Sequence, residues 1–240
     1  MRITQNTLFM TELLHGVAEG HTIPAGMQRQ YVWQEEDVLA LCDSLVSMFP
    51  IGGILTWMPS RGTPKDVAKP RLGPIAPAPG PASRLILDGQ NRLATLAWCL
   101  RGHDPDAELH DASEKEKTTW MNGRELVYNW HNDGFAFMEP QESRELITVP
   151  VRAAFSTGMR TFLDSWNHWA EKGHSDSDIE ACAHQWDKIT RGFQEARIVE
   201  TCLQDATPEE ARHAFLRICR NGVPMSEEDF DAALNWLPSL

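Results

Sequence analysis

The chain has 240 residues, of which 42% are apolar and 23% are charged, the balance of a water-soluble globular protein. Its formal net charge of −12 argues against a broad electrostatic surface for nucleic acid. The first residues lack the apolar run of a signal peptide, and no segment is long and apolar enough to span a bilayer. We therefore expect a cytoplasmic protein without membrane contact.

The first part of the chain alternates between helical and extended patterns. The spacing of apolar residues predicts a helix over 4–20, loop or extended structure over 22–33, a helix opening at 34–37 and a buried strand over 51–57. Acidic side chains fill the first turn of the second helix, where the helix dipole favours them. Seven of the fifteen prolines then fall within 59–82, which predicts a long extended loop.

A strand–turn–helix pattern follows the loop. The run 85–87 predicts a buried strand, Asp88 and the next glycine a turn, and 90–100 an amphipathic helix. Arg92 falls in the first turn of that helix, close to Asp88. A helix N-terminus beside a guanidinium favours an anion such as phosphate, whereas the same residues can also form a capped turn with an Asp–Arg ion pair. Both interpretations stay open at this point.

The charge is distributed unevenly around this pattern. Residues 61–92 contain six basic and two acidic side chains, a net charge of +4 that leaves −16 on the rest of the chain. Such a basic strip would confine a polyanion to one face, although a solvated basic loop is the alternative. The basic residues are Arg61, Lys65, Lys69, Arg71, Arg84 and Arg92.

The second half of the chain predicts a hairpin and several helices. The five cysteines are scattered without any C-x-x-C pair, so no disulfide framework and no metal site are predicted. The expected elements are a hairpin over 125–138 turning at Asn132-Asp133-Gly134, a strand over 146–151, helices over 159–172 and 178–193, a strand over 197–203, a helix from a capping box at 207–210 and a short helix from 226.

These elements together predict an α+β fold in a single structural unit. We expect residues 1–155 to form the main domain, with a mixed sheet core and the proline-rich basic loop 59–82. Residues 156–240 are expected to form a mostly helical C-terminal annex packed on that domain.

Four stretches spread over 23–226 carry a resemblance to a known family. They read Ile-Pro-x-x-x-Gln-Arg-x-Tyr-x-Trp, Phe-Pro-Ile-Gly-x-Ile-Leu-x-Trp, Leu-Asp-Gly-Gln-x-Arg-Leu-x-Thr-Leu and Phe-Leu-Arg-Ile-Cys-Arg-Asn-Gly-Val-Pro-Met-Ser. This order resembles the N-terminal domain family of GmrSD-type restriction systems, the DGQQR-motif domains. The resemblance implies a ParB/sulfiredoxin-like fold and a role in antiviral defence against phage, often directed at modified DNA.

The resemblance also suggests site residues. The family motif, which is associated with nucleotide hydrolysis, maps onto Asp88, Gly89, Gln90, Asn91 and Arg92. Asn91 stands where the family has a second Gln, and its shorter side chain changes its reach. Many members carry a separate HNH nuclease domain, for which this chain has no room. We therefore expect either a separate nuclease chain as partner or chemistry by this domain itself.

The preferred hypothesis is a DNA glycosylase that hydrolyses the base–sugar bond of modified double-stranded phage DNA, such as DNA with glucosylated hydroxymethylcytosine, without a cofactor. The Asp88 carboxylate would orient water or stabilise an oxocarbenium-like centre, with Gln90, Asn91 and Arg92 completing the catalytic site. The further candidates are Gln28, Arg29, Arg84, Arg217 and Asn221 for DNA phosphates, and Tyr31 and Trp33 for the pocket of a flipped base.

Two alternatives belong to other classes. The first is an NTP-hydrolysing sensor subunit with nucleotide and Mg²⁺ as cofactors, whose nuclease is a separate chain. In that case Arg92 and the helix start would hold the triphosphate, because the sequence contains no Walker-type glycine loop. The second is a non-catalytic module that binds DNA or a partner protein.

Overall fold

The computed structural model of the chain describes residues 1–27, 30–60, 70–101, 111–155 and 160–219, and three single positions nearer the C-terminus. The fold is α+β, as predicted, with a five-stranded mixed sheet and a separate three-stranded sheet. The chain divides into two compact units, called unit 1 (Met1–Tyr31, Gly52–Ala94, Arg197–Leu240) and unit 2 (Val32–Ile51, Thr95–Ala196). The domain boundary expected after residue 155 falls inside unit 2, because the chain enters each unit more than once.

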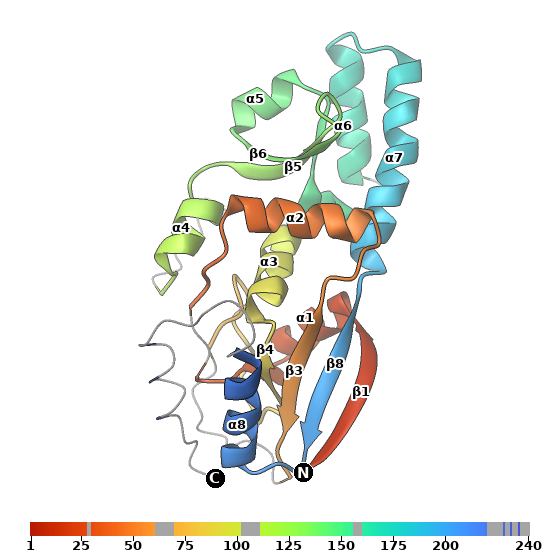
Figure 1. Cartoon of the computed structure of the whole chain (residues 1–240). Helices are drawn as coiled ribbons and strands as arrows, with labels where there is room; N and C mark the ends of the chain where they lie inside the picture. The colour runs from red at the N-terminus through yellow and green to blue at the C-terminus, as the bar shows by residue number, and fades with distance from the viewer. Residues whose placement is uncertain are drawn as a thin grey trace. The chain divides into compact units, whose positions relative to one another are not determined.

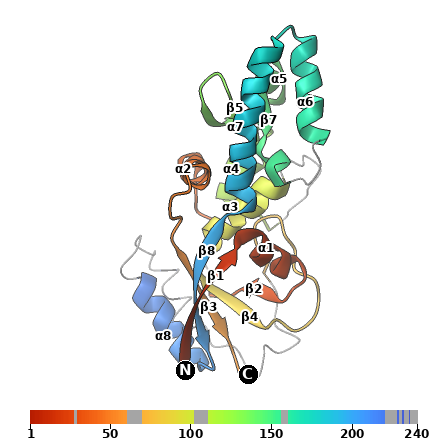
Figure 2. The same cartoon turned by 90° about the vertical axis from the view of Figure 1, so that its right-hand side faces the viewer.

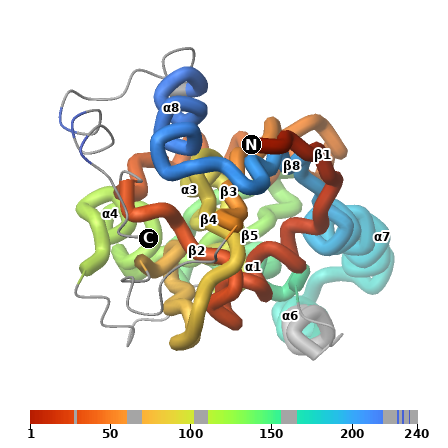
Figure 3. The backbone as a smooth tube through the Cα atoms, turned by 90° about the horizontal axis from the view of Figure 1, so that it is seen from below, coloured from red at the N-terminus to blue at the C-terminus, as the bar shows by residue number. Residues whose placement is uncertain are grey.

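The sheet of unit 1 has the order β1-β8-β3-β4-β2, so β1 and β2 lie at its edges (Figures 1 and 3). Adjacent strands run parallel in β3–β8 and β2–β4 and antiparallel in β1–β8 and β3–β4. The strands are β1 (Arg2–Phe9), β2 (Thr22–Pro24), β3 (Gly53–Met58), β4 (Arg84–Asp88) and β8 (Arg197–Gln204).

The helix predicted over 4–20 is wrong in its first half, where the chain forms β1 before helix α1 (Met10–Ala18). All eight residues of β1 pair with β8, from Arg2 opposite Gln204 to Phe9 opposite Arg197. Local apolar spacing favours a helix there, but pairing with a strand far away in the sequence outweighs that preference. The predicted strand over 197–203 is confirmed as β8.

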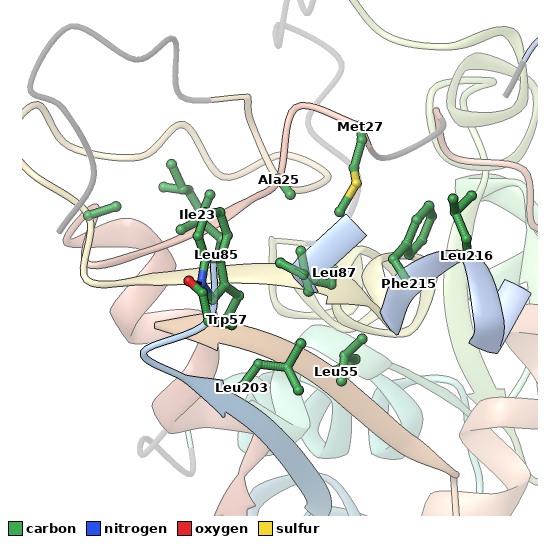
Figure 4. Close-up of a cluster of buried hydrophobic side chains, with 13 residues drawn as sticks. Ile23, Ala25, Met27, Leu55, Trp57, Leu85, Leu87, Leu203, Phe215 and Leu216 are labelled. Carbon is green, nitrogen blue, oxygen red and sulfur yellow. Dashed lines mark hydrogen bonds between the residues drawn. The ribbon is translucent and has the colours of Figure 1, made fainter. Parts of the chain in front are cut away.

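Helices α8 (Pro208–Cys219) and α1 lie on opposite faces of this sheet (Figure 2). The predicted capping box opens α8, because the Thr207 N–H donates to Glu210 Oε2 over 2.8 Å and the Glu210 N–H donates to Thr207 Oγ1 over 3.2 Å. Burial of apolar side chains between α8 and the sheet stabilises this layer. Its members include Ile23, Met27, Leu55, Trp57, Leu85, Leu87, Leu203, Phe215 and Leu216 (Figure 4).

The face of the sheet away from α8 holds a fully buried carboxylate. Glu200, on β8, accepts a hydrogen bond from Thr56 Oγ1 over 2.7 Å and another from Asn6 Nδ2 over 3.0 Å. Arg84 Nε lies 3.2 Å from Glu200 Oε1. A buried charge is costly unless it is paired and hydrogen-bonded. The Glu200 carboxylate meets this need with one partner on each of the strands β1, β3 and β4.

Unit 2 is built around a hairpin and long helices. The predicted hairpin is confirmed: Asn129 pairs with Gly134, and Asp133 adopts φ +48° in the turn. Trp130 contacts the buried Trp169 and Trp186 rings. The elements are β5 (Glu125–Asn129), β6 (Gly134–Met138), β7 (Thr148–Pro150), α2 (Glu35–Val46), α4 (Glu114–Trp120), α5 (Pro140–Glu145), η1 (Val151–Phe155), α6 (Arg160–Glu171) and α7 (Asp176–Gln194).

Helices α2 and α7 cross closely at Gly192. A Cβ atom added there would lie 2.8 Å from the Leu45 carbonyl oxygen and 2.9 Å from Val46 Cα, which are backbone atoms of α2. Gly192→Ala is therefore expected to destabilise the protein by about 1–3 kcal/mol, although Gly→Ala inside a helix ordinarily stabilises. Urea denaturation measures the change. Gly134→Ala is the matched control, since its nearest neighbour would be 3.7 Å away, and equal stability of both variants would contradict the prediction.

The described part of the proline-rich loop is irregular but packed. Leu72 and Ile75 exchange two backbone hydrogen bonds, and the Leu72 side chain is fully buried. Residues 61–69 of this loop and most of the helix expected from 226 lie outside the described residues. No helix in the described part of the chain combines the length and apolarity needed to cross a membrane.

Candidate functional site at the end of strand β4

The predicted strand–turn–helix is confirmed in unit 1. Strand β4 ends at Asp88, Gly89 adopts φ +94°, and helix α3 (Gln90–Arg101) begins at the next residue. The Leu93 N–H donates to the Gly89 carbonyl over 3.2 Å, which makes Gly89 the residue that caps the helix. Because helix geometry gives the N–H groups of Gln90 and Arg92 no acceptor inside α3, this end of the helix favours an anion.

The Arg92 guanidinium is held by backbone. Its Nη1 donates to the Gly53 carbonyl over 2.6 Å, at the start of β3. A Cβ atom on Gly52 would lie 3.2 Å from Arg92 Nη2, and one on Gly89 would lie 3.3 Å from Nη1. The glycines thus leave the space that the guanidinium occupies. This role of Gly52 and Gly53 was not predicted from the sequence, where the available signal was a Gly-Gly pair inside the strand predicted over 51–57.

Asp88 precedes Arg92 by four residues in the sequence, but among the described contacts the two side chains do not form an ion pair. Among the described residues, the Asp88 side chain has no ion pair or hydrogen bond, and both Asp88 and Arg92 are partly exposed. The simple Asp–Arg ion pair is therefore absent from these contacts. Gln90 Oε1 is buried and has no hydrogen-bond partner within the part of the chain that the structure describes. Asn91 is partly exposed in the same helical turn.

All four stretches that carry the resemblance approach one another in unit 1. Met27, Leu55, Leu87 and Phe215 belong to one buried cluster, in which the last turns of α8 pack near the end of β4 (Figure 4). Leu87 precedes Asp88 directly, and the exposed Arg217 follows shortly after Phe215. The candidates that lie outside the described residues are Gln28 and Arg29, which follow Met27, and Asn221.

The remaining predicted site residues in the described part of the chain are Arg84, Tyr31 and Trp33. Arg84 stands four residues before Asp88 on the same strand, about 13 Å away, and faces Glu200 instead. Tyr31 is only 4% exposed, so its ring is a core side chain and does not present a face to a flipped base. Trp33 is partly exposed but belongs to unit 2.

Fewer basic side chains of the strip over 61–92 are available to bind a polyanion than its net charge suggests. Arg71 Nη1 donates to the Gly73 carbonyl within its own loop, and Arg84 and Arg92 are held as described above. The other three members, Arg61, Lys65 and Lys69, lie outside the described residues.

Gly89 tests whether the geometry of the turn matters. A Cβ atom at this position would lie 2.5 Å from Ile54 Cγ2, and φ +94° disfavours any side chain. Gly89→Ala is therefore expected to lose roughly 2–4 kcal/mol of stability by thermal denaturation, from backbone strain and overpacking together. Gly80→Ala is the control, because Gly80 also has a positive φ of +129° but open space around it. A Gly89→Ala loss no larger than that of Gly80→Ala would show that the close approach to Ile54 is unimportant.

The comparison with known families agrees with the motif order in the sequence. Residues 10–235, nearly the whole chain, match the family described as the GmrSD restriction endonuclease, N-terminal domain. Among curated proteins no relative matches the chain. The extent of the family match, together with the strand–turn–helix that carries Asp88 and Arg92, means that the chain belongs to the GmrSD restriction endonuclease N-terminal domain family.

Proposed function

We propose that this protein hydrolyses the N-glycosidic bond between a modified base and its sugar in phage DNA, with Asp88 as the catalytic carboxylate. Its family indicates a DNA-acting component of a restriction system in antiviral defence. The observation that carries the finer proposal is the un-neutralised Asp88 carboxylate beside a guanidinium that the Gly53 carbonyl already holds. A free carboxylate next to a fixed cation suits a reaction that needs a base and a phosphate anchor at one place.

The proposed step needs only these two groups and water. The C1′–N bond breaks, the base leaves with the electron pair, and positive charge develops at C1′. The Asp88 carboxylate stabilises that charge and accepts a proton from the attacking water, which forms the new C1′–O bond. The protonated Asp88 then gives this proton to the departed base anion, which restores the carboxylate. Arg92 and the first turn of α3 would hold the flanking phosphate, and extrusion of the base from the duplex is required for access.

The proposal is tested with duplexes that differ at a single cytosine. The purified protein is incubated with plain, hydroxymethylated and glucosylated duplexes, and alkaline cleavage and mass spectrometry detect abasic sites and released base. Release from a modified duplex and not from the plain one is expected. Intact DNA in all three cases would exclude the glycosylase.

A second candidate function rests on the same helix start. The N-terminus of α3 with Arg92 also suits a triphosphate, and this chemistry would require Mg²⁺ and a separate nuclease chain as the effector. Phosphate release from the four common nucleotides and a raised melting temperature would support it. If nucleotide neither stabilises the protein nor is consumed, this candidate is excluded whatever the result of the glycosylase assay.

A further inference from the structure

Strand β1 forms an exposed edge of the sheet in unit 1. Among the described residues it pairs only with β8, beside which it lies in Figure 3. None of its eight residues is buried. The other side of such a strand presents a row of N–H and C=O groups that can pair with a further strand.

Apart from Arg2 at its start, which donates to Gln204 Oε1 of β8 over 2.9 Å, this edge lacks the features that usually prevent association. Its sequence, Arg-Ile-Thr-Gln-Asn-Thr-Leu-Phe, contains no Lys, Pro, Asp or Glu. The register with β8 is continuous over all eight pairs, without a bulge that would twist the edge away. Natural edge strands are commonly protected by such residues or bulges, so an unprotected edge of this length indicates a partner strand.

Exposed apolar side chains lie beside the edge on one face. Ile3 is opposite Leu203 of the cluster under α8, so the odd-numbered residues of β1 point to the α8 side of the sheet. Ile3 is 57% exposed, Phe9 38%, and Val199, which is opposite Thr7, 50%. The free backbone edge therefore coincides with exposed apolar residues, of which Phe9 is partly covered by the Arg197 guanidinium, 4.5 Å from the ring centroid.

We propose that β1 pairs antiparallel with β1 of a second copy of this chain, around a two-fold axis at Asn6, and so joins the two five-stranded sheets. Facing residues of an antiparallel pair point to the same side of a sheet. In a symmetric pair of β1 strands, an odd-numbered residue can therefore face only an odd-numbered residue, and an even-numbered residue only an even-numbered one. An axis at Asn6 sets Ile3 opposite Phe9 of the second copy and Gln5 opposite its Thr7. The exposed apolar residues then meet each other.

The strand itself favours a second copy over an unrelated partner. Its facing pairs in this register are Ile3 with Phe9, Thr4 with Leu8, Gln5 with Thr7 and Asn6 with itself, and no like charges oppose each other. An axis at Gln5 instead sets Ile3 against Thr7 and leaves Phe9 without a facing residue in the strand. Self-complementary contacts around a two-fold axis are the commonest form of protein association. Because a single strand pair is a small interface, the dimer is expected to form in the micromolar range.

A charge reversal at the facing pair tests both the dimer and its register. Gln5→Glu/Thr7→Glu sets like charges opposite each other twice, whereas Gln5→Glu/Thr7→Lys sets Glu opposite Lys twice. Analytical ultracentrifugation is carried out from low to high micromolar concentration. Over this range the mass of the unsubstituted protein (the parent) and of the Glu/Lys variant should rise from 27.1 kDa, the mass of one chain, towards twice that value. The Glu/Glu variant should remain at 27.1 kDa.

Each remaining outcome overturns the proposal. A parent chain that stays at 27.1 kDa at every concentration has no such dimer, and a Glu/Glu variant that dimerises like the parent uses another surface. Failure of the Glu/Lys variant to associate excludes the register centred on Asn6, because an axis at Gln5 would set the two introduced carboxylates against each other. The two variants share both substituted positions, so equal melting temperatures exclude misfolding as the cause of a difference.

Discussion

Replacing Asp88 by Asn is expected to reduce the rate of base release from modified DNA by roughly 10²–10⁴-fold, the range for loss of a positioned acid or base. The substitution keeps the size of the side chain and removes only its charge and basicity. Asp88 has no ion pair or hydrogen bond among the described residues, so folding should be little affected. The measurement is the single-turnover rate of abasic-site formation at saturating enzyme, which separates chemistry from binding.

The matched control for this variant is Asp205→Asn. Asp205 is exposed, lies after β8 and donates its backbone N–H to the Met58 carbonyl, at the end of β3 away from Gly53. Asn tolerates its φ of +54°, so the same chemical change is made elsewhere in unit 1 without strain. If Asp88→Asn releases the base as fast as the unsubstituted protein does, Asp88 is not the catalytic carboxylate, even if the enzyme is a glycosylase.

Replacing Glu200 by Ala is expected to lower the free energy of unfolding by about 3–5 kcal/mol, the range for breaking a buried ion pair by removing one partner. The truncation would leave the Thr56 hydroxyl and the Asn6 amide without their acceptor and the Arg84 guanidinium without its ion-pair partner. For a chain of this length the melting temperature should fall by roughly 10 °C or more, measured by calorimetry or circular dichroism.

Two further variants compare partial and unrelated losses with the loss in Glu200→Ala. Glu200→Gln keeps an oxygen acceptor for Thr56, but it replaces the oxygen that accepts from Asn6 with an NH2 group and removes the charge opposite Arg84. A smaller loss than that of Glu200→Ala is expected because one of the two hydrogen bonds is kept. Glu19→Ala removes an exposed carboxylate that lies 3.1 Å from His15, and no measurable change is expected because solvent screens that pair. If Glu200→Ala is as stable as Glu19→Ala, the buried polar contacts across the sheet contribute nothing to stability.

Much of the local structure could be predicted from the sequence because its signals act over a few residues. Asp133-Gly134 marks the hairpin turn, the capping box at Thr207 marks the start of α8, and Asp88-Gly89 marks the change from strand to helix. In each case the hydrogen bonds or backbone angles that decide the conformation involve near neighbours in the chain. The family resemblance was also readable, because it rests on the order of short motifs.

Only the tertiary structure determined which residues of these local elements contact one another. Residues 2–9 become a strand because β8, far away in the sequence, supplies the pairing that a helical apolar pattern does not reveal. Arg92 is directed by the Gly53 carbonyl rather than by Asp88, and Arg84 turns to the buried Glu200 rather than to the candidate site. The sequence by itself determined which charged and glycine residues are present around Asp88. Which of them pair is decided by the fold, because the cost of leaving a buried charge or backbone carbonyl unpaired depends on neighbours that only the folded chain brings together.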